Sequence, residues 1–274
     1  MNFQKYFLVD NGSLRPESIL SLREVAENLK FKTGVSILPA GIMHSHKIDP
    51  CKLNGIPALS MQSFFKSFDK QKVESLAFIP MFLGPSLAIT DWLNTQLCEW
   101  KRTRPARKYA IAETLFREGD DRITLALNDH VVKGLTTGFT GKPFIILVDH
   151  GTPLKEVNKV REEVGGQLGK LVAKYSSGFS TACMERRDGS DYDFNDPLLE
   201  KVLQEVYEEG GREVVLAPFF LAPGRHAGPD GDLASICLPF EKKGMRIMRT
   251  STLGNHPLIL DILTERFHEV SAKI

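Results

Sequence analysis

The chain of 274 residues is long enough to bury one large core or two smaller ones without disulfide or metal staples. Its 35 basic and 34 acidic residues give a formal net charge of +1, and 42% of its residues are hydrophobic. This balance lacks the basic excess of proteins that bind nucleic acid or anionic membranes, so neither partner is expected.

Cysteine spacing and the N-terminal sequence indicate the compartment. Four cysteines lie far apart without any C-x-x-C pair, which argues against a zinc or iron–sulfur site and favours reduced, mostly buried thiols. The N-terminus has no basic region followed by a long apolar segment, and no apolar run reaches the roughly 18 residues of a membrane helix. We therefore expect a cytoplasmic protein.

Short apolar runs alternate with amphipathic stretches along both halves of the chain. For the first half we predict a strand at 5–10, a helix at 17–29, a strand at 35–40, a helix near 61–70, strands at 75–83 and 108–113, and a helix at 122–132. For the second half we predict a strand at 144–148, a helix over 157–172, a strand at 179–184, a helix at 197–209, a strand at 213–221, an extended segment at 245–252 and a helix from 257. Strands alternating with helices predict an α/β fold with parallel sheets.

The two halves also resemble each other in sequence. "LVDNGS" (8–13) matches "LVDHGT" (147–152), and residues 119–131 match 254–266. A third match, between 76–93 and 214–233, aligns Pro80 with Pro218 and Asp91 with Asp230. Because the blocks recur in the same order, we infer two fused copies of one domain, residues 1–138 and 139–274. The join is expected within 133–143, where glycine, proline and threonine interrupt the periodicity.

Polar residues that follow the predicted strands indicate where a ligand binds. The carboxyl ends of parallel strands meet at one edge of a sheet, and α/β proteins place their ligands there. In the second half these positions hold His150, Glu185, His226 and His256; in the first half they hold Asn11, His44, Ser86 or Leu87, and Asp120 or Asp121. We therefore expect the ligand site in the second half.

Two histidines and a carboxylate suit a borderline divalent metal ion. We predict that His150, His226 and Glu185 bind the metal and carry the chemistry. A solvated loop carboxylate is an equally good interpretation of Glu185. His256 can equally belong to the start of the last helix, and His44 and His46 are typical of exposed loop histidines.

At this point the sequence resembles a known family. "LVDHGTP", "MER", "PFFLAPGRHAGPDGDL" and "LGNHPLILDILTER" are similar, in order and spacing, to the class II tetrapyrrole chelatases, and especially to the CbiX-like sirohydrochlorin chelatases. The resemblance covers residues 142–274 and, more faintly, 1–135. It implies a chelatase-like α/β fold of two similar domains, each with a parallel sheet flanked by helices, which face each other across a cleft.

The resemblance also implies a reaction: insertion of Co²⁺ or Fe²⁺ into sirohydrochlorin or a related tetrapyrrole, in the biosynthesis of cobalamin or siroheme. The family's two histidines fall on His150 and His226, and its glutamate falls most plausibly on Glu185. The metal, which could also be Ni²⁺, is then a substrate, and no permanent cofactor is expected. This chain departs from long-chain members that carry the histidine pair in the first half, because its first half has Asn11.

The tetrapyrrole should meet basic side chains, because sirohydrochlorin carries eight carboxylates. Arg225, Arg186 and Arg187 lie beside the predicted metal ligands and can form bidentate pairs with carboxylates, although surface salt bridges explain them equally well. Asn11 is expected to contact the opposite face of the ring. The duplicated chain supplies both walls of a cleft, so either a monomer or a homodimer fits.

Two other functions fit parts of the pattern. A tetrapyrrole or metal carrier would keep the same cleft without turnover. A phosphatase with a phosphorylated histidine is suggested by the likeness of "LVDHGT" to "LVRHGE". However, Asp149 stands where that chemistry needs an arginine, and its charge would repel phosphate.

Overall fold

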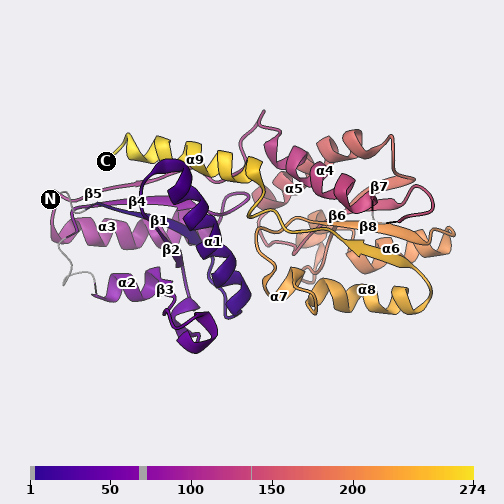
Figure 1. Ribbon diagram of the computed structural model, residues 1–274, viewed down its shortest axis with the longest axis horizontal. Helices are drawn as coiled ribbons and strands as arrows, with labels where there is room; N and C mark the ends of the chain where they lie inside the picture. The colour runs from indigo at the N-terminus through magenta and orange to yellow at the C-terminus, as the bar shows by residue number, and fades with distance from the viewer. Residues whose placement is uncertain (1–3, 68–72, 137) are drawn as a thin grey trace. The chain divides into compact units, whose positions relative to one another are not determined.

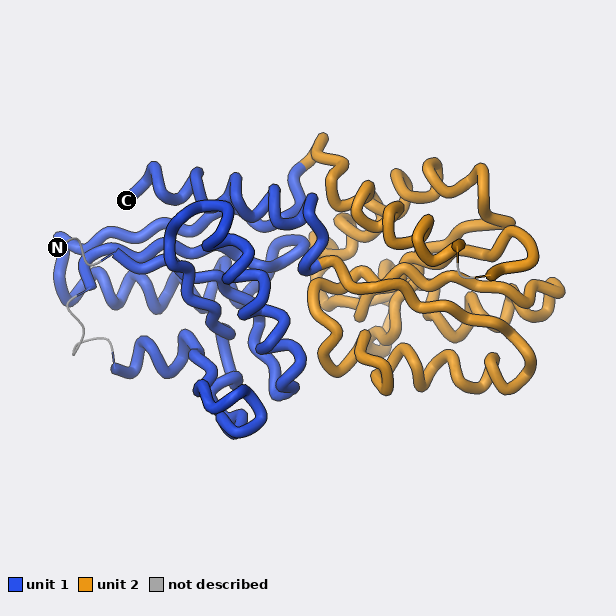
Figure 2. Tube along the Cα trace, viewed as in Figure 1, with its two compact units in different colours: residues 1–117, 254–274 blue, residues 118–253 orange. Residues whose placement is uncertain are grey.

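The computed structural model describes residues 4–67, 73–136 and 138–274. The chain forms two compact units, which Figure 2 colours separately: residues 1–117 with 254–274 (unit 1), and residues 118–253 (unit 2). In the described residues each unit has one parallel sheet flanked by helices, which confirms the predicted α/β class. Within the same ranges, none of the helices combines the length and the apolar character that a membrane crossing needs.

The sheet of unit 1 has the strand order β3-β2-β1-β4-β5. Its strands are β1 (Gln4–Asp10), β2 (Ile37–Gly41), β3 (Leu59–Ser60), β4 (Ser75–Pro80) and β5 (Lys108–Ile111). One face carries α1 (Pro16–Thr33) and α9 (Pro257–Ser271), and the other carries α2 (Met61–Ser67) and α3 (Asn94–Thr103) (Figure 1). Short turns of helix cover Ser45–Lys47, Pro50–Leu53 and Ala88–Leu93. Strand β1 is central, and Phe7, Leu8 and Val9 are fully buried because helices cover both faces.

The sheet of unit 2 has the strand order β7-β6-β8-β9. Its strands are β6 (Phe144–Asp149), β7 (Gly178–Cys183), β8 (Glu213–Pro218) and β9 (Arg246–Arg249). Helices α4 (Arg122–Leu135) and α5 (Lys155–Val172) cover one face, and α6 (Leu199–Glu208) and α8 (Asp232–Lys242) cover the other (Figure 1). The short α7 (Gly224–Ala227) joins β8 to α8, and a 3₁₀ turn spans Ser190–Asn195.

The predicted elements agree with these bounds within a few residues, although the predicted segments at 75–83, 108–113, 213–221 and 245–252 extend beyond the observed strands. Helices α3 and α8 were not predicted. The helix predicted near 61–70 is described from Met61 to Ser67, and positions 68–70 lie outside the described residues. The two-residue strand Leu59–Ser60 was not predicted, because so short a segment has no recognisable periodicity.

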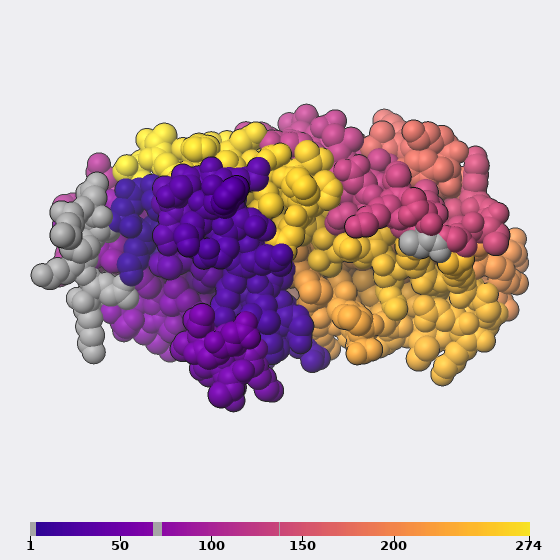
Figure 3. Space-filling model, viewed as in Figure 1, coloured from indigo at the N-terminus to yellow at the C-terminus, as the bar shows by residue number. Residues whose placement is uncertain are grey.

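The compact units differ from the predicted domains, 1–138 and 139–274, by an exchange of their last helices. Helix α4 packs on α5 and β8 of unit 2, whereas α9 packs on α1 and β4 of unit 1. In the space-filling view, the yellow atoms of α9 lie against the indigo and violet atoms of unit 1 (Figure 3). The final helix of each sequence repeat therefore completes the other compact unit.

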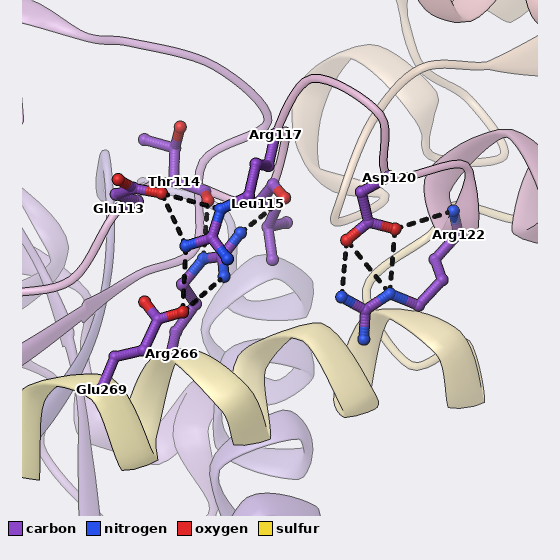
Figure 4. A network of polar contacts seen from close by, with 8 residues as sticks. All are labelled: Glu113, Thr114, Leu115, Arg117, Asp120, Arg122, Arg266 and Glu269. Carbon is purple, nitrogen blue, oxygen red and sulfur yellow. Dashed lines mark hydrogen bonds and ion pairs between the residues drawn. The ribbon is translucent and has the colours of Figure 1, made fainter.

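Buried Arg266 fastens α9 to unit 1. Its guanidinium donates to the carbonyl oxygens of Thr114, at 3.0 Å, and Leu115, at 3.4 Å, just beyond β5. Glu269, one turn further along α9, accepts from both Arg266 and Arg117 (Figure 4). Charged hydrogen bonds thus hold the helix to a segment far away in sequence.

Two glycines inside α5 allow the helix to approach β7 closely. Each costs about 1 kcal/mol relative to alanine within a helix. A β-carbon at Gly165 would lie 2.3 Å from Thr181 Cγ2, and one at Gly169 would lie 2.9 Å from Phe179 Cδ1. These contacts explain both glycines. Nothing in the structure explains Gly166, whose β-carbon would have no neighbour within 4 Å.

Candidate functional site

The polar residues that follow β6, β7 and β8 lie together at the carboxyl edge of the unit 2 sheet. The ring centroids of His150 and His226 are 4.4 Å apart, and the ring planes are inclined at 57°. The Nε2 atom of His150 lies 3.1 Å from Oε1 of Glu185. The structure thus brings together the three residues that the sequence suggested as metal ligands, as expected for strands that run in parallel.

A tight turn brings His150 and Glu185 together. Asp149 Oδ1 accepts a hydrogen bond of 3.0 Å from the Gly151 amide, and the Glu185 amide donates to the His150 carbonyl at 3.2 Å. Gly151 has φ of +92°, and a β-carbon there would lie 1.9 Å from the Glu185 carbonyl oxygen. Only glycine fits this turn, both for its backbone conformation and for its closeness to the next loop.

An ion pair buried in unit 2 supports the turn. The Arg161 guanidinium donates to Asp149 Oδ1 at 3.1 Å and to the Asn195 carbonyl at 2.9 Å. The Asn195 side chain in turn accepts from the Thr152 amide and donates to the Thr152 carbonyl, both at 2.9 Å. Burial raises the pKa of Asp149, and the charge of Arg161 opposes this rise.

His226 is oriented by Asp232, the first residue of α8. Their Nδ1 and Oδ2 atoms are 2.8 Å apart, so Nδ1 carries the proton and Nε2 is left with its lone pair for a ligand. Burial lowers the pKa of His226, the Asp232 hydrogen bond opposes this, and the nearby His150 adds to the lowering. The neutral imidazole, which is the form that binds metals, is thereby favoured at neutral pH.

The three residues do not form a finished metal cage. Among residues 4–67, 73–136 and 138–274, no three His, Cys, Asp or Glu side chains are grouped to hold one metal ion. The Glu185 side chain is 71% exposed, and its Oε1 atom lies near Nε2 of His150. The arrangement is that of two fixed imidazoles with a solvent-facing carboxylate beside one of them.

The arginines near the site differ in how strongly other protein groups already hold them. Arg186 forms ion pairs with Asp193, at 2.9 Å, and with Asp196, at 3.0 Å, so it mainly holds its own loop. Arg225 is 70% exposed and has a long contact of 3.4 Å to Asp232. Arg187 lies over the Tyr192 ring. A pocket of about 380 Å³ is lined by His150, Gly151, Thr152, Pro153, Glu185, Arg186 and Arg187. Arg225 and Arg187 are therefore better placed than Arg186 to receive carboxylates.

Matching backbone hydrogen bonds identify the equivalent positions in unit 1. The Met43 amide donates to the Asn11 carbonyl as the Glu185 amide donates to the His150 carbonyl. Met43 is therefore the counterpart of Glu185, and the match of His44 to Glu185 was wrong by one residue. His44 instead sits, exposed, in a left-handed turn with φ of 63°.

The third strands can be compared in the same way. The Met81 amide donates to the Val9 carbonyl, and the Phe219 amide donates in the same way to the Val148 carbonyl. Pro80 and Pro218, one residue earlier, are therefore equivalent, as the sequence alignment had them. Counting onward at equal spacing, Ala88, rather than Ser86 or Leu87, stands opposite His226, and Leu87 stands opposite Arg225. Asn94 begins α3 as Asp232 begins α8. The residue opposite Asp230 is therefore Trp92, and the alignment with Asp91 was one residue off.

His256, His46 and Asp120 have local roles. His256 is the N-cap of α9, where its Nδ1 atom accepts from the Leu258 amide at 3.2 Å. His46 Nδ1 lies 2.7 Å from the hydroxyl of Ser60 in unit 1. Asp120 pairs with Arg122 at the start of α4. None of them belongs to the cluster around His150.

The sequence interpretation missed Arg161, Asn195 and Asp232. Arg161 had a usable signal, because it lies among the apolar positions Val157, Val160 and Val164 of α5, where a charge must be paired inside the core. Asp232 lies six residues after His226 at a helix start, but without coordinates nothing joined the two.

Comparison with known proteins agrees with this geometry. Residues 144–270 match the model of the CbiX family. The match covers less than half of the chain, from the start of β6 into α9. The matched CbiX region contains His150, Glu185, His226 and Asp232, and it extends into α9.

A curated relative matches a segment of this chain that is similar in length to the CbiX match. The chloroplastic sirohydrochlorin ferrochelatase of Arabidopsis thaliana is 29% identical over 122 residues, which are 44% of this chain. The chain spans about half the length of that relative, 50%.

Solved structures extend the likeness of fold beyond the CbiX region. SirB from Bacillus subtilis, solved with Fe³⁺, superposes with a TM-score of 0.72 at 14% identity, over 98% of this chain and 96% of that one. The sirohydrochlorin chelatase SirB from Bacillus subtilis subspecies spizizenii, solved with cobalt, gives a TM-score of 0.69 at 12% identity, over 98% and 95% of the two chains. The chain therefore has the fold of these chelatases.

Proposed function

We propose that this protein inserts a divalent metal ion, Co²⁺ or Fe²⁺, into sirohydrochlorin or a closely related tetrapyrrole. The observation that carries the proposal is the pair of imidazoles 4.4 Å apart at an open sheet edge, with a carboxylate oxygen 3.1 Å from one of them. Support also comes from the CbiX family match and from a relative named as a sirohydrochlorin ferrochelatase. Siroheme or cobalamin synthesis would be the corresponding pathway.

The atoms of the site suit a metal ion that is bound only briefly. Ligand atoms about 2.1 Å from one ion, and at right angles to each other, are about 3 Å apart. The His150 Nε2 and Glu185 Oε1 atoms have this separation. His226 adds a second nitrogen. An ion held by these groups keeps open positions for the pyrrole nitrogens that replace them.

Metal insertion also releases two protons from the pyrrole N–H groups. Glu185 is exposed beside the ion and can accept one as the metal leaves. His226 can accept the other on Nε2, and Asp232 would stabilise the resulting imidazolium through Nδ1. Arg225 and Arg187 would pair with the carboxylates on the rim of the macrocycle. The metal is thus a substrate, and the expectation of no permanent cofactor stays a prediction.

The experiment is a spectroscopic assay of metal insertion. Purified protein is mixed with sirohydrochlorin and Co²⁺, Fe²⁺ or Ni²⁺ without oxygen, and the absorbance change is compared with the reaction without protein. We expect acceleration that disappears in the double variant H150A/H226A. Equal rates with and without protein would refute the proposal.

The same samples test the alternatives. A carrier would bind sirohydrochlorin, seen as a spectral shift, without accelerating insertion. A phosphatase would hydrolyse a generic aryl phosphate, which we expect this protein not to do. The cytoplasmic location and the choice between monomer and homodimer stay predictions.

A further inference from the structure

Arg161 is a fully buried charge that the proposed reaction does not use. Its side chain has no exposed surface and donates to Asp149 Oδ1 at 3.1 Å, the Asn195 carbonyl at 2.9 Å and Glu162 Oε1 at 2.8 Å. Moving a guanidinium out of water is costly, and buried ion pairs often stabilise a fold less than apolar residues of the same size. Stability alone is therefore a poor reason for this residue.

Through its partners, Arg161 is connected to the residues before and after His150 in the sequence. Asp149 precedes the histidine and, besides its bond to Arg161, accepts from the Gly151 amide. Asn195 holds Thr152 through both its amide and its carbonyl. One guanidinium thus ties the residue before His150 to the segment that holds the residues after it.

Unit 1 contains the same turn without the arginine. Helices α1 and α5 both have 18 residues, and their seventh residues are Leu22 and Arg161. Gly12 still donates to Asp10 Oδ1 at 2.9 Å, still has a positive φ of +88°, and would still place a β-carbon 1.9 Å from the Met43 carbonyl oxygen. The shape of the turn therefore does not require Arg161. The arginine occurs in the copy that has the histidine.

We propose that Arg161 is a positioning residue for metal binding: by clamping Asp149 and Asn195 it fixes the imidazole of His150 for the incoming ion. The inference rests on the proposed function, because it concerns the same site. Direct hydrogen-bond partners of metal ligands change metal affinity by about 10–100-fold when they are replaced. Arg161 acts on His150 through Asp149 and Asn195, so we expect an effect at the lower end of that range.

The test measures binding of Co²⁺ alone to the full chain, by the visible absorption of the bound ion, together with thermal unfolding. We expect R161L to fold, since leucine fills the equivalent place in unit 1, and to bind Co²⁺ about tenfold or more weakly. R161K should lie between R161L and the wild type, because one ammonium group cannot reach both partners. The matched control is R107L, in which a buried arginine of unit 1, bonded to Trp100 and Thr103, is replaced. It should lose thermal stability and keep its Co²⁺ affinity.

Each other outcome has a definite meaning. If R161L binds Co²⁺ within about twofold of wild type while H150A loses binding, the metal site stands and the positioning role is wrong. If R161L does not fold, the argument from unit 1 is wrong, and the role of the arginine is structural. If H150A binds Co²⁺ as the wild type does, the metal site itself fails, and the proposed function fails with it.

Discussion

The two units share a turn but not its chemistry. Asp10 and Gly12 in unit 1, and Asp149 and Gly151 in unit 2, build the same loop after the central strand. Six ionisable residues around that loop in unit 2 have counterparts that cannot ionise: His150 and Asn11, Arg161 and Leu22, Glu185 and Met43, Arg225 and Leu87, His226 and Ala88, Asp232 and Asn94. The comparison shows that the backbone of the site is retained without its reactive groups, so fold and function depend on separate residues.

The largest expected difference between the units concerns the histidines. We expect H150A or H226A to lower the rate of metal insertion at least 100-fold, about 3 kcal/mol of lost transition-state stabilisation. The matched change A88S in unit 1 should leave the rate within twofold of wild type. Initial rates at varied substrate concentration check this, and equal losses from A88S and H226A would contradict it.

The next largest effect is expected at Asp232. Replacing it in D232N keeps an oxygen near His226 Nδ1 but removes the charge that orients and polarises the ring. We expect Co²⁺ affinity to fall about tenfold, by analogy with other partners of metal-binding histidines. N94D, which puts the carboxylate at the equivalent helix start in unit 1, should leave the affinity unchanged. Titration with Co²⁺ measures both, and a D232N affinity equal to wild type counts against the orienting role.

Glu185 should matter less than the histidines. Its side chain is largely exposed, and solvent weakens the interactions of an exposed carboxylate. We expect E185Q to slow metal insertion a few-fold, because a neutral amide can neither balance the charge of the ion nor accept a proton. The control M43Q in unit 1 should have no effect on the rate. A loss of 100-fold or more in E185Q would show that the carboxylate is an essential ligand.

The smallest effect is one of stability and concerns Asp10. Burial raises the pKa of Asp10 from 3.8 to about 6. A pKa that is raised in the folded state favours folding while the group is protonated, so this contribution is complete below pH 4 and is lost as the pH rises through about 6. An asparagine at this position would carry no charge at any pH, so we expect D10N to be more stable than wild type at pH 8 and this advantage to shrink toward pH 4. Because part of the Asp10 surface is exposed, solvent reduces the expected difference to roughly 1 kcal/mol. Chemical denaturation at both pH values measures it, and a pH-independent difference would be the contrary result.

Much of the fold could be predicted because its signals are local. The run Ile145 to Val148 is apolar at every position, as a strand buried on both faces requires, and the same order of strands and helices appears in both halves. The gathering of His150, Glu185 and His226 followed from the parallel direction of β6, β7 and β8 alone.

The parts that were missed depend on contacts distant in sequence. Helices α4 and α9 both have an apolar face, but the sequence of a helix does not indicate which of the two sheets that face will cover. The predicted ends of β2 and β7, at 40 and 184, were each one residue away from the observed ends at Gly41 and Cys183, so the match of Met43 to Glu185 needed the structure. Arg161 was overlooked because helical periodicity describes the apolar residues around it and says nothing of the carboxylate beneath.

The exchange of α4 and α9 sets an order of assembly during synthesis. Residues 118–253 are continuous in the chain, so unit 2 has all of its parts as soon as Leu253 has left the ribosome. Unit 1 must wait for α9, and until then its sheet has one face incompletely covered. Unit 2, which bears His150 and His226, can therefore be complete before unit 1, although unit 1 contains the N-terminal residues. A chain cut near residue 138 would remove α4 from unit 2 and α9 from unit 1.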